Sequence, residues 1–260
     1  MTARDHRIRP RVDRFLARGQ KNETAVIIPA RAGSKGIPGK NLRECVDQET
    51  LLETAIFKTK HALGKTADIY VSTEDSTIRQ AGLRAGAMYI PRPPALAGDQ
   101  ASTDDVLLAA IDWLHDEELE ELILIQCTAP LMFPSDITGT LQAMREQHTD
   151  CAFAAARFYH FLWAHKGRET VGINHDGTVG RKRRQDLPIQ YLEAGSVYTM
   201  QVEPFKAAKN RFCGKIAIYE IPSIRCMEIG TETDLVAARA LVSDGRFVSR
   251  ALWEPPAEIK

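Results

Sequence analysis

The sequence has no excess of charge of either sign, because its 34 lysine and arginine residues equal its 34 aspartate and glutamate residues. A balanced chain does not predict a general surface for nucleic acid or for anionic membranes, so we expect local clusters of charge to do any recognition. The five cysteines are an odd number and show no CxxC spacing, which argues against a disulfide framework and a zinc site. We therefore expect a reducing compartment, the cytoplasm.

Long apolar runs are also lacking. No stretch is long enough to span a bilayer, and the first 22 residues, which hold six arginines, lack the apolar core of a signal peptide. We expect residues 1–24 to form a basic arm and residues 246–260 to form a tail. Internal repeats and low-complexity tracts are absent from the sequence as well.

Short apolar runs alternate with segments of helical spacing along most of the chain. The apolar runs are residues 25–30, 68–73, 122–126 and 151–156, and the helical segments between them are residues 75–86, 102–117 and 135–148. This alternation predicts an α/β fold with a mostly parallel sheet covered on both faces. In such sheets ligands bind beyond the carboxyl ends of the strands.

The alternation breaks at about residues 158–190, a segment rich in aromatic residues, glycine and positive charge. Strand and helix patterns return at residues 196–200, 215–222 and 232–242. We therefore expect one domain over residues 25–245, with a small lobe inserted at about 158–190.

The stretch VIIPARAGSKGIPGKN, residues 26–41, opens as an apolar strand and becomes rich in glycine and positive charge. Its glycines let backbone amides approach a ligand, and Arg31, Lys35 and Lys40 add charge where the strand ends. This combination suits a triphosphate, although a basic surface turn is the simpler alternative. In a P-loop the lysine is followed by a serine or threonine whose hydroxyl binds magnesium, but here Asn41 follows Lys40, which disfavours a P-loop NTPase. The dinucleotide-binding pattern GxGxxG is absent too.

This stretch resembles the signature of the acylneuraminate cytidylyltransferases, the CMP-sialic acid synthetases. The resemblance continues, in the family's order, through VSTEDSTI, RPPALAGDQASTDDVLLAAI, LILIQCTAPL, RRQDLP, GSVYTM and, more weakly, MEIGTETDL. It spans about residues 25–242 and implies a Rossmann-like nucleotidyltransferase fold with a small dimerisation lobe. It further implies a homodimer that transfers CMP from CTP to the anomeric hydroxyl of a nonulosonic acid and releases pyrophosphate.

The resemblance also implies roles for individual residues. Arg31 and Lys40 match positions that bind the CTP phosphates, and we take them as catalytic because they would stabilise charge on the departing pyrophosphate. The positions expected to bind the nucleotide are Ala30, Ala32, Gly33, Ser34, Lys35, Asn41, which matches a contact to the base, Arg92 and Ser102. Two of these have simpler alternatives, because Arg92 could form a surface ion pair and Ser102 could cap a helix.

For the acceptor, the resemblance assigns Gln126 to the sugar acid, and Arg184 and Gln185 to its carboxylate or to the phosphates. The run of four positive residues at 181–184 is alternatively a solvated charge run. The aromatic side chains within residues 158–163 indicate a hydrophobic lobe or a dimer surface rather than a surface on which nucleotide bases stack.

Two departures from the family pattern bear on the metal and the acceptor. Relatives carry two carboxylates for Mg²⁺ where this sequence has Glu228 and Gly230, so we expect Glu228 alone to bind the metal, with triphosphate and water. Ala194 and Gly195 replace an Asn-Gly pair and resemble the pseudaminic acid branch. An eight-carbon keto sugar or a phosphonate is an alternative acceptor, and a catalytically impaired nucleotide-binding homologue is another alternative. No histidine stands in a matching motif as a general base.

Overall fold

A computed structural model describes residues 22–46 and 48–244 of the 260-residue chain. The predicted tail and all but the last three residues of the predicted arm lie outside this part. Within it, no helix is both long enough and apolar enough to cross a membrane.

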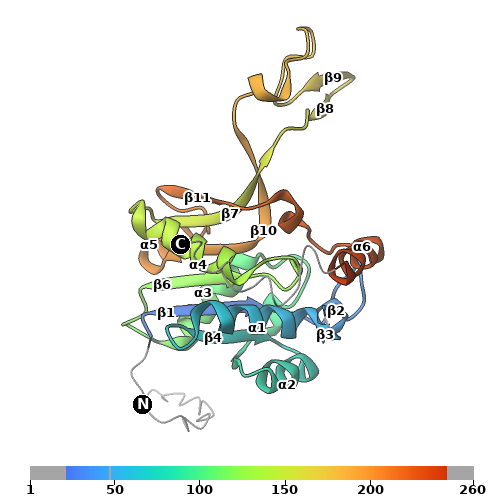
Figure 1. The fold of residues 1–260 in the computed structure, drawn as a ribbon. Helices are drawn as coiled ribbons and strands as arrows, with labels where there is room; N and C mark the ends of the chain where they lie inside the picture. Colours follow the sequence, from blue (N-terminus) through green and yellow to red (C-terminus); the bar gives the residue numbers. More distant parts are fainter. Residues whose placement is uncertain (1–21, 47, 245–260) are drawn as a thin grey trace, which may run out of the picture.

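The centre of the described structure is a seven-stranded sheet with the order β11-β7-β10-β6-β1-β4-β5 (Figure 1). Its strands are β1 (Thr24–Pro29), β4 (Asp68–Thr73), β5 (Met88–Pro91), β6 (Glu121–Ile125), β7 (Cys151–Phe158), β10 (Gln190–Gln201) and β11 (Ile216–Glu220). The pairs β1–β4, β4–β5, β1–β6 and β7–β11 are parallel, whereas β10 is antiparallel to both β6 and β7. The predicted α/β fold with a mostly parallel sheet is therefore confirmed.

Helices cover both faces of this sheet, because successive residues of the central strands point to opposite sides. Val26 and Ile28 of β1 belong to one buried cluster, and Ala25 and Ile27 belong to the other. The first cluster contains residues of α1 (Leu51–Leu63), α2 (Ser76–Arg84), α4 (Pro134–Glu146) and α6 (Glu232–Ser243). The second contains residues of α3 (Thr103–Leu114) and α5 (Val202–Ala208).

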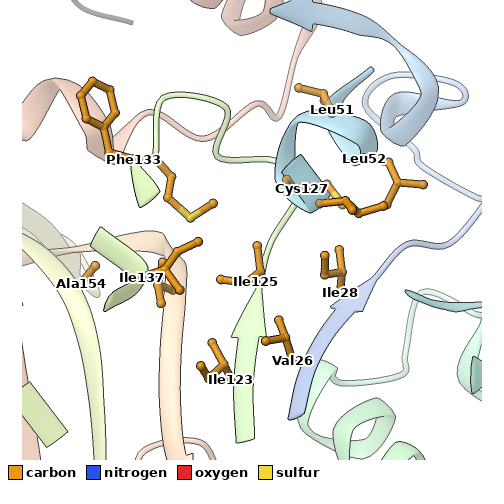
Figure 2. Close-up of a cluster of buried hydrophobic side chains, with 14 of the residues drawn as sticks. Val26, Ile28, Leu51, Leu52, Ile123, Ile125, Cys127, Phe133, Ile137 and Ala154 are labelled. Carbon is orange, nitrogen blue, oxygen red and sulfur yellow. The ribbon is translucent and has the colours of Figure 1, made fainter. Parts of the chain in front are cut away.

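Figure 2 shows part of the first cluster, where side chains of β1 and β6 point toward Leu51 and Leu52 at the start of α1 and toward Ile137 of α4. Both helices begin at residues that satisfy free backbone N–H groups. Thr50 and Glu53 form a capping box at α1, and Asp136 accepts the N–H of Phe133 at α4. A sheet packed in this way on both faces leaves the loops at its edge as the place for a site.

Short elements complete the core. The loop after β1 leads into a 3-10 turn at Lys40–Leu42 and the small strands β2 (Glu44–Val46) and β3 (Glu49–Thr50). Further 3-10 turns lie at Pro94–Leu96 and Ser223–Cys226.

A lobe projects from the sheet between β7 and β10 (Figure 1). The last residue of β7, Phe158, pairs with the first of β10, Gln190, and the chain between them forms the hairpin of β8 (Trp163–Lys166) and β9 (Glu169–Gly172) and a 3-10 turn at Arg184–Asp186. The rings of Phe161 and Trp163 each contact His175 edge-on, with centroids 4.7 Å apart.

Candidate active site

The loop after β1 lines a cavity of about 400 Å³ at the carboxyl end of the sheet. We call it the first cavity. The residues that line it are Pro29, Arg31, Ser34, Lys35, Gly36, Lys40, Asn41, Arg92, Leu96, Gly98, Ala101, Ser102, Thr103, Val106 and Thr128. Seven of the predicted catalytic and nucleotide-binding residues are in this set: Arg31, Ser34, Lys35, Lys40, Asn41, Arg92 and Ser102.

Two cations of the loop meet on one carboxylate. Asp99 lies 2.9 Å from Arg31 and 2.8 Å from Lys35, measured between nitrogen and oxygen atoms. Hydrogen bonds from Lys35 and Arg31 lower the pKa of Asp99, so its carboxyl group is ionised. These two cations therefore converge on one negative charge, as they would on a phosphate group.

Lys40 joins the loop to the segment that carries Glu228. Its Nζ donates a hydrogen bond to the carbonyl oxygen of Ile229 at 2.8 Å. Burial lowers the pKa of Lys40, and the nearby charge of Glu228 opposes this effect. Gly36 adds a close backbone contact, because a Cβ atom at this position would lie 2.1 Å from the carbonyl oxygen of Gly230. Only glycine fits there without a shift of the backbone.

Asn41 and Arg92 are buried in the floor of the first cavity. The Nδ2 of Asn41 donates to the carbonyl oxygen of Arg31 at 3.0 Å, which holds the start of the loop. Arg92 is 7% exposed and donates through one terminal nitrogen to the carbonyl oxygen of Ser72 at 3.2 Å. Its buried Nε has no hydrogen-bond partner in the described part of the chain. Arg92 is therefore not a surface ion pair, and a ligand oxygen would satisfy this donor.

Ser102 caps a helix and lines the first cavity as well. Its Oγ accepts the backbone N–H of Asp105 at 3.0 Å at the N-terminus of α3. The same Oγ donates to the carboxylate of Asp105 at 2.7 Å. The capping alternative is therefore observed, and contact with a nucleotide stays a prediction.

Three of the predicted nucleotide-binding residues do not line the first cavity. Ala30 is fully buried and its N–H donates to the carbonyl oxygen of Ser72 at 3.0 Å. The N–H of Ala32 donates to Glu74 Oε1 at 2.9 Å. Gly33 is exposed, and a Cβ atom there would meet nothing within 4 Å. Their direct contact with a nucleotide stays a prediction.

A second cavity, of about 540 Å³, adjoins the first, since Thr103 lines both. We call it the second cavity. Its lining residues are Thr103, Asp104, Gln126, Glu193, Gly195, Tyr198, Asn210, Arg211, Phe212 and Glu228. It contains Gln126, predicted to face the sugar acid, and Glu228, predicted to bind the metal.

Thr128 connects the two cavities. It lines the first cavity, and its Oγ1 donates to Glu228 Oε1 in the second at 3.2 Å. Its carbonyl oxygen accepts the N–H of Ile229 at 2.7 Å. Gly195 has φ of +63°, and a Cβ atom there would lie 3.1 Å from Glu228 Oε2. A glycine at this position therefore keeps space beside the carboxylate.

Carboxylates near Glu228 along the chain are already paired. Asp234 accepts hydrogen bonds from the N–H groups of Gly230 and Thr231, and Glu232 pairs with Arg43 at 2.7 Å. Within the described residues, no group of three histidine, cysteine, aspartate or glutamate residues could hold a metal ion. Glu228 itself lines the second cavity and accepts a hydrogen bond from Thr128, which lines the first.

The lobe residues Arg184 and Gln185 line neither cavity. They lie in the exposed 3-10 turn at Arg184–Asp186. The guanidinium carbon of Arg184 lies 3.9 Å from the centroid of the Tyr159 ring. The predicted contact of these two residues with the sugar acid stays a prediction.

The motifs missed several residues of the site: Thr103, Thr128 and Arg211 line the cavities, and Asp99 pairs with the lining residues Arg31 and Lys35. Asp99, Thr103 and Thr128 stand inside segments that matched the family, but no spacing rule singled them out. Arg211 lies between α5 and β11 in a stretch without a motif, so no sequence signal pointed to it.

The model of the protein family Cytidylyltransferase matches residues 25–221 of this chain. The chain belongs to the cytidylyltransferase family. This match covers most of the chain and contains all the residues of the first cavity.

Curated relatives of this chain confirm the resemblance. An N-acylneuraminate cytidylyltransferase of Streptococcus agalactiae serotype V is 28% identical over 213 residues, which cover 81% of this chain and 51% of that protein. An N-acylneuraminate cytidylyltransferase of Oncorhynchus mykiss is 28% identical, and the match covers 88% of this chain and 52% of that protein. A pseudaminic acid cytidylyltransferase of Campylobacter jejuni is 25% identical, and the match covers 83% of this chain and 94% of that protein. The chain thus spans about half the length of the N-acylneuraminate relatives.

Solved structures support the fold of this chain. A CMP:2-keto-3-deoxy-manno-octonic acid synthetase, solved with CTP, has a TM-score of 0.60 at 19% identity and covers 85% of this chain and 99% of its own. A 4-diphosphocytidyl-2C-methyl-D-erythritol synthase of Anaerococcus prevotii has a TM-score of 0.60 at 13% identity. The match covers 86% of this chain and 99% of that chain. At these identities the likeness concerns the fold alone.

Proposed function

We propose that this cytidylyltransferase transfers CMP from CTP to the anomeric hydroxyl of a nonulosonic acid and releases pyrophosphate. The observation that carries the proposal is the pair of adjoining cavities. The first gathers the cations Arg31, Lys35 and Lys40, and the second holds Gln126 and Glu228. A triphosphate in the first cavity and an acceptor in the second would bring the two reacting groups together at Thr103.

In the proposed reaction the anomeric oxygen attacks the α-phosphorus of CTP directly. A new bond forms between the anomeric oxygen and the α-phosphorus, the bond between the α-phosphorus and the bridging oxygen breaks, and the acceptor hydroxyl releases its proton to water. Negative charge grows on the departing pyrophosphate, and Arg31, Lys35 and Lys40 stabilise it. CTP would replace Asp99 as the partner of Arg31 and Lys35. Arg92 and Asn41, buried in the floor of the first cavity, would bind the nucleotide through fixed donors.

We propose Mg²⁺ as the cofactor. When bound to the triphosphate, Mg²⁺ supplies positive charge that offsets the charge of the phosphate oxygens. The Glu228 carboxylate fits this ion, because it lines the second cavity and contacts Thr128 of the first. Mg²⁺ can bind a single protein carboxylate together with phosphate oxygens and water. Gly230 offers no second carboxylate.

The acceptor class and the assembly are parts of the same proposal. The Ala194-Gly195 pair, of which Gly195 lines the second cavity, favours a nine-carbon acid, as do the pseudaminic acid and N-acylneuraminate relatives. We propose a homodimer in which Arg184 and Gln185 of the projecting lobe reach the acceptor site of the partner subunit. We propose the cytoplasm as the compartment, because Cys45, Cys127, Cys151, Cys213 and Cys226 are all free thiols.

The test is to incubate the full chain with CTP, Mg²⁺ and one acid at a time, and to follow pyrophosphate release. The acids are N-acetylneuraminic acid, pseudaminic acid and 2-keto-3-deoxy-manno-octonic acid. We expect turnover with a nine-carbon acid, and stronger protection against thermal unfolding by CTP than by ATP or GTP. Turnover with the eight-carbon acid alone would change the acceptor class. CTP binding without turnover on any acid would identify a catalytically impaired homologue.

A further inference from the structure

Within the second cavity, we propose that Arg211 binds the carboxylate of the acceptor and that Asp104 positions its guanidinium group. This inference rests on the proposed function and names the residue that selects an acid as the acceptor. It differs from the sequence prediction, which assigned Arg184 and Gln185 of the lobe to the carboxylate or to the phosphates.

Arg211 is held firmly between separate elements. It follows α5, and its Nε donates to Asp104 Oδ1 in the first turn of α3 at 2.9 Å. The side chains of Arg211 and Asp104 are only 14% and 19% exposed. The guanidinium carbon of Arg211 also lies 5.0 Å from the centroid of the Tyr198 ring on β10. The guanidinium group is therefore oriented before any ligand arrives.

The donors of Arg211 that remain suit a carboxylate. In the described chain its hydrogen bond to Asp104 uses Nε, and no hydrogen bond involves its two terminal nitrogens. Arg211 lines the second cavity, so these nitrogens offer a planar pair of donors to a ligand there. A guanidinium of this geometry binds a carboxylate through two parallel hydrogen bonds.

The charges around Arg211 limit where a carboxylate can lie. Among the described residues that line the second cavity, Arg211 is the single cation, whereas Asp104, Glu193 and Glu228 are acidic. An acceptor carboxylate beside Glu193 or Glu228 would meet a like charge. The acceptor would therefore turn its carboxylate toward Arg211.

The acidic side chains have partners of their own, which suits them to accept hydroxyl groups of a sugar. Glu193 accepts a hydrogen bond from the hydroxyl of Tyr198, and Glu228 accepts one from Thr128. Burial and the neighbouring Glu193 raise the pKa of Tyr198, so its hydroxyl keeps its proton. Together with Gln126 they supply polar groups to the second cavity.

The competing explanation is that the pair of Arg211 and Asp104 only ties the loop to α3. A pair of equal length exists for comparison, because Arg157 Nε donates to Glu220 at 2.9 Å and Arg157 lines neither cavity, although this pair is more exposed, at 46% and 44%. If the pair of Arg211 and Asp104 only ties the loop to α3, Arg211→Gln should lower the melting temperature and leave the preference for the acid over its carboxamide unchanged.

The experiment compares wild type, Arg211→Gln, Arg211→Lys and Arg157→Gln, each checked for folding by its melting temperature. For each, KM for CTP and for the nine-carbon acid that supports turnover, N-acetylneuraminic or pseudaminic acid, is measured through pyrophosphate release, and the acid is compared with its carboxamide. We expect Arg211→Gln to raise the KM for the acid about 10- to 100-fold, as for loss of a charge-assisted hydrogen bond, with the KM for CTP unchanged. The variant should also lose the preference for the acid over the carboxamide. Arg211→Lys should recover part of the acid's binding, and Arg157→Gln should match wild type.

Two results would overturn the proposal: an unchanged KM for the acid in Arg211→Gln, or a preference for the acid that survives the substitution. If no acid supports turnover, the proposed function fails, and calorimetric binding of N-acetylneuraminic acid to the CTP-loaded protein then tests the inference separately. Binding that Arg211→Gln weakens supports it, whereas equal binding, or no binding by wild type, overturns it.

Discussion

Replacing Gly36 by alanine should damage the site through one backbone contact. The loop after β1 reaches the segment of Glu228 at two points, the contact of Gly36 with Gly230 and the hydrogen bond from Lys40 to Ile229 at 2.8 Å. A Cβ atom on Gly36 would lie 2.1 Å from the carbonyl oxygen of Gly230, whereas ordinary contacts begin at 3.4 Å. The two backbones would have to separate by more than an ångström.

The expected cost of Gly36→Ala follows from this distance. Overpacking of this kind costs about 1–3 kcal/mol of folding free energy, which lowers the melting temperature of a domain of this size by roughly 2–4 °C for each kcal/mol. The same separation would lengthen the hydrogen bond of Lys40 and shift Glu228 relative to the first cavity. A displacement of about 1 Å can cost on the order of 100-fold in catalysis, so we expect kcat/KM for CTP to fall by that factor.

Gly33→Ala is the matched control in the same loop. A Cβ atom on Gly33 would meet nothing within 4 Å, and neither glycine has a positive φ. Alanine at such a site should leave stability unchanged or raise it by about 0.4–1 kcal/mol. Melting temperature and pyrophosphate release are measured for both variants and wild type. If Gly36→Ala behaves like Gly33→Ala in both measurements, the contact with Gly230 does not hold the site.

Further predictions concern the charges of the site. Arg31→Ala and Lys40→Ala should each reduce turnover by an amount worth ~3 kcal/mol, as for one preorganised donor, and wild-type turnover in either would refute their catalytic role. Glu228→Gln should raise the Mg²⁺ concentration needed for half-maximal pyrophosphate release, because it removes a carboxylate ligand. Gly230→Asp should lower that concentration by adding a carboxylate, and there is room for it because a Cβ atom on Gly230 would lie an ordinary 3.6 Å from Asp234. An unchanged magnesium titration for Glu228→Gln would show that Glu228 is not a ligand. Asp99→Asn should lower the Kd for CTP about twofold to fivefold at low salt, because Asp99 competes with phosphate for two cations; weaker binding in a calorimetric titration would mean that Asp99 organises the cations instead.

Local sequence patterns predicted the strands well where both faces are buried. The apolar runs at residues 25–30, 68–73, 122–126 and 151–156 correspond to β1, β4, β6 and β7, because each such strand must present apolar side chains to two layers of helices. The direction of β10 was not predictable in this way. A strand's own residues set its burial, whereas its pairing partners come from distant parts of the chain.

The loop after β1 was predicted for a similar reason. Strand, glycines and cations stand next to one another in the sequence, so their meeting at one end of the sheet needs no long-range information. For Arg92 the sequence left a surface ion pair open, and burial in the floor of the first cavity excluded it.

The amino-acid sequence by itself determined the family, the alternation of strands and helices, and the cluster of Arg31, Lys35 and Lys40, because these depend on residues close together in the chain. Only the tertiary structure decided which distant residues complete the site. Asp99 reaches two cations of the loop, Thr128 connects two cavities, and Arg211 stands over Tyr198 against Asp104, 107 positions away. Such contacts arise from packing helices and loops on a common sheet, and no local spacing encodes them.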